Sequence, residues 1–139
     1  YAYVNTTYQD LRDTRDYEPA STVPNPTKGK RMPNIPYLMA NAGVEFHREN
    51  LFGGSGQNTR LFADVAFVEE YFYDFEMTQL QKRRIPRSTT LDIGFEHSFL
   101  NNKLFISGKL RNVTNEKTLS EFNRPLMGIN GGVKIRVIF

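Results

Sequence analysis

The sequence contains no cysteine and no tryptophan among its 139 residues. The absence of cysteine excludes a disulfide scaffold, a thiolate metal site and catalysis by a cysteine nucleophile. A continuous run of about 18 apolar residues, the length that a transmembrane helix needs, is also absent. The sequence therefore excludes a disulfide-stapled protein and a bundle of apolar membrane helices.

What the sequence does have is a high aromatic content and a mild excess of positive charge. Phenylalanine and tyrosine make up 13% of the chain, which is too much for a disordered segment. Lysine and arginine number 18 against 15 acidic residues, so the net charge is +3. This balance permits an anionic partner without requiring one. The length suits one domain, or a piece of one, over residues 1–139.

Hydrophobic residues recur at every second position along most of the chain. In the segment 128–139, Val133 and Ile135 lie on one face of an extended chain, and Lys134 and Arg136 lie on the other. A helix would place these two cations on different faces, so the pattern predicts a strand. The same alternation occurs in residues 38–47, 60–71, 90–99 and 104–111, and residues 1–11 form a further expected strand.

Short and long connections alternate between these expected strands. Residues 48–58 and 100–102 suit hairpin turns, whereas residues 12–35, 74–87 and 112–127 form long connections. All short turns then fall at one end of the sheet. The first long connection and its exit are rich in proline, so we expect any order there to come from the proline rings. The sequence predicts an all-β fold of about six long antiparallel strands.

Four features favour a membrane barrel over a soluble β-sandwich. The strands are close to the length that a tilted strand needs to cross a bilayer, and the long loops lie on one side, as in outer-membrane barrels. Charged residues on the opposite faces of the strands would suit a wet lumen. Aromatic residues near strand ends fit interfacial girdles: Tyr37, Phe46, Tyr71, Tyr73, Phe99 and Phe139. A sandwich also explains the alternation, with its charged faces in solvent.

Short motifs in a fixed order then suggest a family. Residues 110–116 (LRNVTNE) resemble an x-x-N-x-x-N segment that opens the last extracellular loop of TonB-dependent outer-membrane receptors. Residues 133–139 (VKIRVIF) resemble the final strand that the barrel assembly machinery recognises. Residues 32–37, 85–92 and 125–128 are similar to approaches into downward strands. The resemblance covers essentially the whole chain and implies the last six strands of a barrel of about 22 strands.

The resemblance carries several expectations about function. It implies part of a transporter in the bacterial outer membrane that imports a scarce nutrient, most often an iron chelate such as a ferric siderophore. Expected partners are outer-membrane lipid, lipopolysaccharide, a plug domain, the remaining barrel strands and the barrel assembly machinery, with Phe139 as the assembly signal. The TonB complex would be contacted through an N-terminal part outside these residues. Six strands would leave two open edges, which lipid does not tolerate, so we expect a longer protein.

Two other interpretations stay open at this point. One is a subunit of an oligomeric outer-membrane barrel that several chains share. The other is a soluble β-sandwich that acts as a binding module. A platform for single-stranded nucleic acid is disfavoured, because most aromatic and charged residues fall on opposite faces of the strands.

Basic residues close two of the long connections. We predict that they contact an anionic ligand or lipopolysaccharide phosphates, with ordinary solvated charge as the alternative. They are Lys28, Lys30 and Arg31 in the first connection, and Lys82, Arg83, Arg84 and Arg87 in the second.

The remaining candidates for chemistry are few. The two histidines, His47 and His97, lie outside any metal-ligand spacing and outside any nucleophile pattern. We therefore expect no catalytic residue, no cofactor, no metal and no enzymatic activity. Acidic residues on the charged faces are expected to pair with cations on neighbouring strands, either as a structural ladder or as contacts to a plug. The acids are Asp92, Glu96 and Glu45, and the cations are Lys109, Arg111, Lys134 and Arg136.

Overall fold

The computed structural model describes residues 1–75, 84–121 and 124–139. All the regular secondary structure within these residues is β-strand, which confirms the predicted all-β class. Six strands form one antiparallel sheet in the order β1-β2-β3-β6-β7-β10. They are β1 (Ala2–Tyr8), β2 (Leu38–Glu49), β3 (Asn58–Val68), β6 (Ser88–Phe99), β7 (Leu104–Arg111) and β10 (Asn130–Val137).

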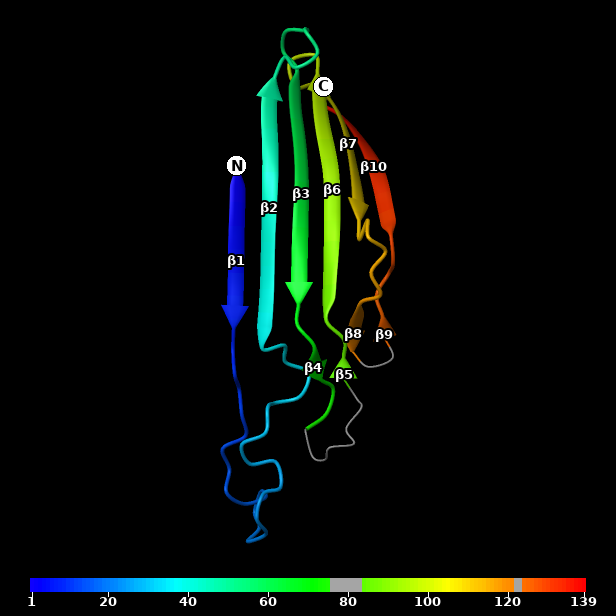
Figure 1. The fold of residues 1–139 in the computed structure, drawn as a ribbon. Coiled ribbons are helices and arrows are strands. Elements are labelled where there is room, and N and C mark those ends of the chain that lie inside the picture. Colours follow the sequence, from blue (N-terminus) through cyan, green and yellow to red (C-terminus); the bar gives the residue numbers. More distant parts are fainter. Residues whose placement is uncertain (76–83, 122–123) are drawn as a thin grey trace.

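The six strands follow one another across the sheet in chain order (Figure 1). The β2–β3 and β6–β7 turns lie at one end, here called the turn end, and the long connections lie at the other, the loop end. This arrangement confirms the predicted alternation of links. Two small hairpins that the sequence did not predict extend the loop end: β4 (Tyr71–Phe72) with β5 (Arg84–Ile85), and β8 (Leu119–Glu121) with β9 (Arg124–Pro125).

The register places the apolar sides of all six strands on the same face of the sheet. Across one row, Val44 pairs with Ala63, Ala63 with Ile93, Ile93 with Leu110, and Leu110 with Gly131. We call this side the apolar face and the other the polar face. Arg48 is the one charged residue that the six strands place on the apolar face. The polar face carries Glu45, Glu49, Arg60, Asp64, Asp92, Glu96, Lys109, Arg111, Lys134 and Arg136.

The sheet is a single open layer, with β1 and β10 as its edges. Large apolar side chains are consequently exposed along one face, including Val133 at 76% and Ile135 at 66%. Among the described residues, Ile85 alone is a fully buried hydrophobic residue. The six strands are thus not divided between two packed sheets, as a sandwich made by this chain would require. In the described part of the chain, no helix has the length and hydrophobicity to span a membrane.

Asparagine residues close the two short turns and join them. The β6–β7 turn has three successive residues in the left-handed region, Leu100, Asn101 and Asn102 (φ 52°, 53° and 66°). Asparagine adopts this conformation more readily than most residues. The Asn101 amide donates to the Gly56 carbonyl at 3.1 Å, and the Ser98 hydroxyl donates to Asn102 Oδ1 at 2.6 Å. The turn end is therefore fixed by side chains as well as by the strands.

Candidate functional site

The first long connection is ordered around one buried carboxylate, that of Asp13. Its side chain is about 4% exposed and accepts hydrogen bonds from Arg15 Nη2 (2.7 Å), Thr27 Oγ1 (2.7 Å) and Asn25 Nδ2 (3.1 Å). The Gly29 amide donates to the Asp13 carbonyl at 2.7 Å. The expectation that proline rings would order this loop is thus incomplete, because a polar network also holds its two sides together.

Cationic neighbours lower the pKa of Asp13 in this loop and of Asp10 just before it. Arg15, followed by Thr27 and Asn25, holds the pKa of Asp13 far below its usual range, and Asp13 in turn raises the pKa of Arg15. Hydrogen bonds from Arg12 and Arg31 lower the pKa of Asp10 in the same way. Both carboxylates are therefore charged at neutral pH and neutralise nearby cations.

A small cavity joins the first and second connections at the loop end. It has a volume of about 250 Å³, and its lining includes Arg31, Tyr37, Glu70, Phe72 and Arg84. Arg31 stacks over the Tyr37 ring at 4.3 Å, and Arg84 stacks over the Phe72 ring at 4.9 Å. The cavity thus combines three aromatic rings, those of Tyr37, Tyr71 and Phe72, with two guanidinium groups, a set that suits a planar or anionic ligand.

Acidic partners occupy most of the described basic residues that the sequence singled out. Arg31 Nε pairs with Asp10 at 2.9 Å, Arg84 Nη1 pairs with Glu70 at 2.7 Å, and Lys28 pairs with Asp16. N–H donors remain on both guanidinium groups, because each has five. The structure brings Arg31 and Arg84 to one cavity, but Lys28 pairs elsewhere in the loop. Lys30 does not line that cavity, and Lys82 and Arg83 lie outside the described residues.

The asparagines of the resemblance motif organise the start of the third connection. Asn112 is 5% exposed and has a φ of 51°. Its Oδ1 accepts from the Glu116 amide, and its Nδ2 donates to the Glu116 carbonyl, both at 2.8 Å. Asn115 Oδ1 accepts from the Ile129 amide at 3.1 Å, next to the start of β10. The motif therefore has a structural role in closing this loop, a role that the sequence analysis missed.

The polar face carries ion pairs between neighbouring strands. Arg60 Nη2 pairs with Glu45 at 2.6 Å, and Lys109 Nζ pairs with Asp92 at 3.2 Å. The expected pairing of Asp92 with Lys109 is confirmed, whereas Glu45 pairs with a residue outside the expected set. Arg136 stacks over the Phe105 ring at 4.1 Å. These contacts form a charged but largely neutralised surface.

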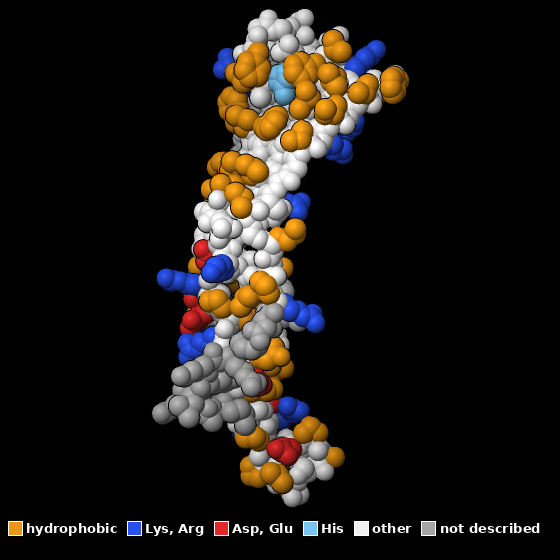
Figure 2. Space-filling model, turned by 90° about the vertical axis from the view of Figure 1, so that its right-hand side faces the viewer, with side chains coloured by type: hydrophobic (Ala, Val, Ile, Leu, Met, Phe, Trp, Pro, Cys, Tyr) orange, Lys and Arg blue, Asp and Glu red, His pale blue; other side chains and the backbone are white. Residues whose placement is uncertain are grey.

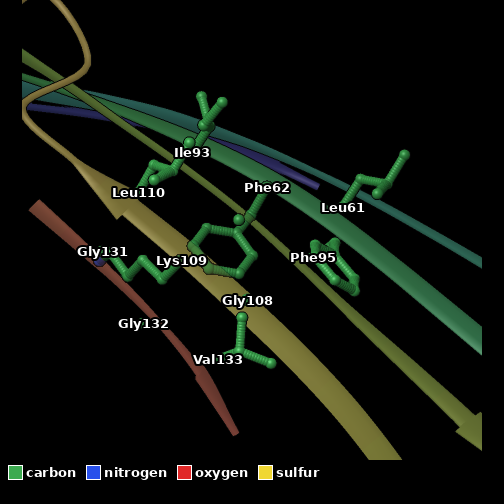
Figure 3. Close-up of a pocket in the computed structure, with 11 residues that line it drawn as sticks. Leu61, Phe62, Ile93, Phe95, Gly108, Lys109, Leu110, Gly131, Gly132 and Val133 are labelled. Carbon is green, nitrogen blue, oxygen red and sulfur yellow. The ribbon is translucent and has the colours of Figure 1, made fainter.

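The apolar face contains a groove of about 720 Å³ (Figure 3). Its floor includes Gly108 and Gly131, which carry no side chain between the apolar residues of neighbouring strands. The register shows that seven of the lining residues share the apolar face: Leu61, Ile93, Phe95, Gly108, Leu110, Gly131 and Val133. The groove is therefore a hydrophobic surface open to the surroundings of the sheet.

His97 lies on the apolar face near the turn end, and His47 lies on the polar face. His97 is 8% exposed, and its Nδ1 is 2.9 Å from Thr59 Oγ1. Its Nε2 is buried and has no hydrogen-bond partner. The rings of Phe52 and Phe99 contact it edge to face at 5.3 Å and 4.2 Å. Figure 2 shows hydrophobic side chains gathered around a histidine at this end.

Comparisons with known proteins do not identify a family for this chain. Searches against family models, curated proteins and solved structures find no match for the chain. Among the described residues, no group of three or more histidine and acidic side chains is arranged to hold a metal ion. Phe139, the expected assembly signal, is fully exposed and follows the end of β10.

Proposed function

We propose that this chain forms part of the wall of a transmembrane β-barrel in the bacterial outer membrane. The barrel would belong to a receptor of the TonB-dependent type that imports a scarce nutrient, most commonly an iron chelate such as a ferric siderophore. In this proposal the apolar face meets lipid, the polar face lines the lumen, and the loop end faces the outside of the cell.

The segregation of residues between the two faces carries this proposal. The six strands place ten acidic and basic residues on the polar face and one, Arg48, on the apolar face. Exposed apolar area on this scale is costly in water and favourable in lipid. A charged, water-filled lumen accounts equally for the other face. The single layer of strands supports a barrel wall more strongly than a sandwich.

The open edges of the sheet support closure by further strands. β1 and β10 each have one neighbour, so each presents a row of unpaired backbone groups. Such groups cost several kcal/mol each in lipid, by rough estimate, unless another strand pairs with them. We propose that the remaining strands of the same barrel occupy both edges, while a plug domain contacts the ion pairs of the polar face.

The loop end is the side that we assign to ligand capture. The cavity between Arg31 and Arg84 offers stacked guanidinium groups with free donors, and a chelate with carboxylate or catecholate groups would match them. Lipopolysaccharide phosphates are the second chemistry that this loop end could contact. Charge alone does not choose between them, because Asp10 and Glu70 already neutralise much of the positive charge.

Two measurements on cells that make the protein test the proposal. Membrane fractionation should place the protein in the outer membrane, in a form that migrates differently on electrophoresis before and after heating. Deletion of the gene should then reduce uptake of at least one radiolabelled ferric chelate, and the wild-type gene should restore it. A protein recovered in the soluble fraction would contradict the membrane assignment. Unchanged uptake of every nutrient tested would contradict the import assignment.

A further inference from the structure

Charges on the polar face are sorted across the width of the sheet. Strands β7 and β10 contribute only cations to this face: Lys109, Arg111, Lys134 and Arg136. Strands β2, β3 and β6 contribute Arg60 and all of the acids: Glu45, Glu49, Asp64, Asp92 and Glu96. The polar face is thus neutral as a whole, but it is acidic toward β2 and basic toward β10.

A hollow of about 390 Å³, here called the basic hollow, lies on the polar face between β3 and β10. Its polar-face lining includes Ser107, Lys109, Gly132 and Lys134. A Cβ atom at Gly132 would meet nothing within 4 Å, so the space beside the two lysines is open. Lys109 pairs with Asp92, whereas Lys134 has no carboxylate at ion-pair distance in the described part of the chain. The basic hollow therefore suits one incoming carboxylate.

Two further charges line the basic hollow, those of Arg60 and Glu96. They lie directly opposite each other on β3 and β6, so their charges offset each other. Ser107 separates Glu96 from Lys134 in the same row, which places the backbones of these two residues roughly 10 Å apart. Lys134 is consequently the charge of this hollow that most needs a counter-charge from outside the sheet.

A second hollow of about 470 Å³, here called the acidic hollow, lies over β1, β2 and β3. It adjoins the basic hollow, because Arg60 and Phe62 line both. Asp64 in its lining accepts a hydrogen bond from the Tyr3 hydroxyl at 2.7 Å and lies directly opposite Asp92. Like charges opposite each other are unfavourable, and no cation of the described residues lies at ion-pair distance from Asp64. The acidic hollow therefore suits an incoming cation.

The spacing of the two hollows favours an extended partner over a small ion. Asp64 and Lys134 are separated by three strand spacings and by four residues along β10, a distance of roughly 20 Å along the sheet. A small anion would fill the basic hollow alone. An extended polypeptide would span both hollows with about six residues.

We propose that the polar face docks a polypeptide segment that places a carboxylate beside Lys134 and a lysine or arginine beside Asp64. The segment belongs to the same protein, lies outside residues 1–139 and fills the lumen. The inference rests on the proposed barrel, whose lumen this face would line. Charge complementarity carries it, because each hollow lacks the opposite charge that the segment supplies.

The test uses the whole protein in isolated outer membranes. A water-soluble carbodiimide joins a lysine amine to a carboxylate in contact with it, and mass spectrometry of the digested protein identifies the linked residues. Lys109 and Asp92, which are 3.2 Å apart, give the internal standard. We expect Lys134 to be linked to an aspartate or glutamate of the lumenal segment. Lys103, an exposed residue of the β6–β7 turn, should not be linked to that segment.

Variants separate the two charges. Lys134→Arg keeps the charge but has no amine to link, so the Lys134 link should be lost while the Lys109–Asp92 link remains. Asp64→Asn should lower the yield of the Lys134 link about two- to fivefold, the size expected for one solvent-exposed ion pair. Glu49→Gln is the matched control, because Glu49 lies on the same face outside both hollows, and it should leave the yield unchanged.

Each other outcome overturns a stated claim. A Lys134 link to Glu96 alone, or to a strand that pairs with the edge of β10, shows that the sheet neutralises itself and overturns the docked segment. The absence of any Lys134 link beside a normal Lys109–Asp92 link does the same, while the barrel stands. An unchanged yield in Asp64→Asn overturns the contact at the acidic hollow. A protein that is absent from the outer membrane overturns the proposed function and the inference together.

Discussion

The two faces of the sheet differ more from each other than any two strands do. On the apolar face, the side chains of Val44, Val133 and Ile135 are more than half exposed, and Arg48 is the one charged residue that the six strands place there. On the polar face, Arg60 and Lys109 are held by carboxylates on neighbouring strands. Both faces belong to the same single layer of six strands, so the difference between them lies in their side chains.

Solvent exposure alone does not distinguish the two faces; the chemistry of their exposed side chains does. A soluble protein rarely exposes a contiguous apolar patch of more than a few hundred Å². Here such a patch continues across all six strands, because the register aligns their apolar sides. The ion pairs of the polar face add little to the free energy of unfolding, because solvent-exposed ion pairs are weak. The expected effects of substitutions therefore differ sharply between the faces.

The largest effect should come from a charge placed on the apolar face. Val65→Arg introduces a cation near the middle of that face, and its neighbour Ala66→Arg does the same on the polar face. For Val65→Arg in lipid we expect a loss of about 2–4 kcal/mol in the free energy of unfolding. For Ala66→Arg we expect a change within about 0.5 kcal/mol. Urea unfolding in lipid vesicles measures both, and equal effects would remove the distinction between the faces.

A pair of glycines tests packing within the polar face. A Cβ atom at Gly94 would collide with Phe62 Cζ and lie 2.9 Å from the Gly108 carbonyl oxygen, whereas one at Gly132 would meet nothing within 4 Å. Gly94→Ala should therefore cost about 1–3 kcal/mol in the same unfolding assay. Gly132→Ala should leave the midpoint almost unchanged, and a comparable loss there would contradict the packing described for Phe62.

As the pH falls, acid should destabilise the loop end before it destabilises the apolar face. The native contacts lower the pKa of Asp13 below its unfolded value of 3.8, so its contribution to stability is present above that pH and is lost as the pH falls toward the native pKa. We expect amide hydrogen exchange at Gly29 and Lys30, corrected for the intrinsic effect of pH, to accelerate below pH 3.8.

Asp13→Asn should produce the same loosening at neutral pH and weaken its pH dependence. Asp16→Asn breaks the exposed pair with Lys28 and is the control, because it should leave protection at Gly29 unchanged. Equal protection in all three proteins at every pH would show that Asp13 does not hold the loop.

The smallest effect should come from an ion pair on the polar face. Arg60→Gln breaks the ion pair with Glu45, and both side chains of this pair are partly exposed to solvent. We expect a shift in the unfolding midpoint smaller than that of Gly94→Ala, and one that disappears at high salt because screening removes exposed pairs. A large, salt-insensitive loss would indicate that the polar face is as tightly packed as a protein core.

The sequence predicts the six strands and their faces because alternation is a local signal that every strand carries. It does not predict the hairpins β4–β5 and β8–β9, because ladders of two or three residues contain no period. The predicted strand over residues 60–71 is divided in the structure, where β3 ends at Val68 and β4 begins at Tyr71. Short elements therefore depend on contacts that only the folded chain supplies.

The candidate site at the loop end could likewise be predicted only in part from the sequence. The basic loop residues are visible in sequence, but the acids that neutralise them lie up to 21 residues away, as for Arg31 and Asp10. Asp13 gives no periodic signal within a proline-rich loop. Asn112 and Asn115 are noticeable by their spacing, yet their left-handed backbone and their bonds to Glu116 and Ile129 explain that spacing only in the structure.

The contact of alternate residues with lipid is the measurement that tests the central claim most directly. The chain has no cysteine, so single cysteines introduced one at a time at positions 60–67 of β3 can each carry one nitroxide label. Collision rates with oxygen, which concentrates in lipid, and with a water-soluble nickel chelate then report the surroundings of each position. We predict a period of two, with lipid contact at Leu61, Ala63, Val65 and Phe67 and water contact at Arg60, Phe62, Asp64 and Ala66. Equal access of the nickel chelate to both sets would contradict a lipid-facing apolar surface.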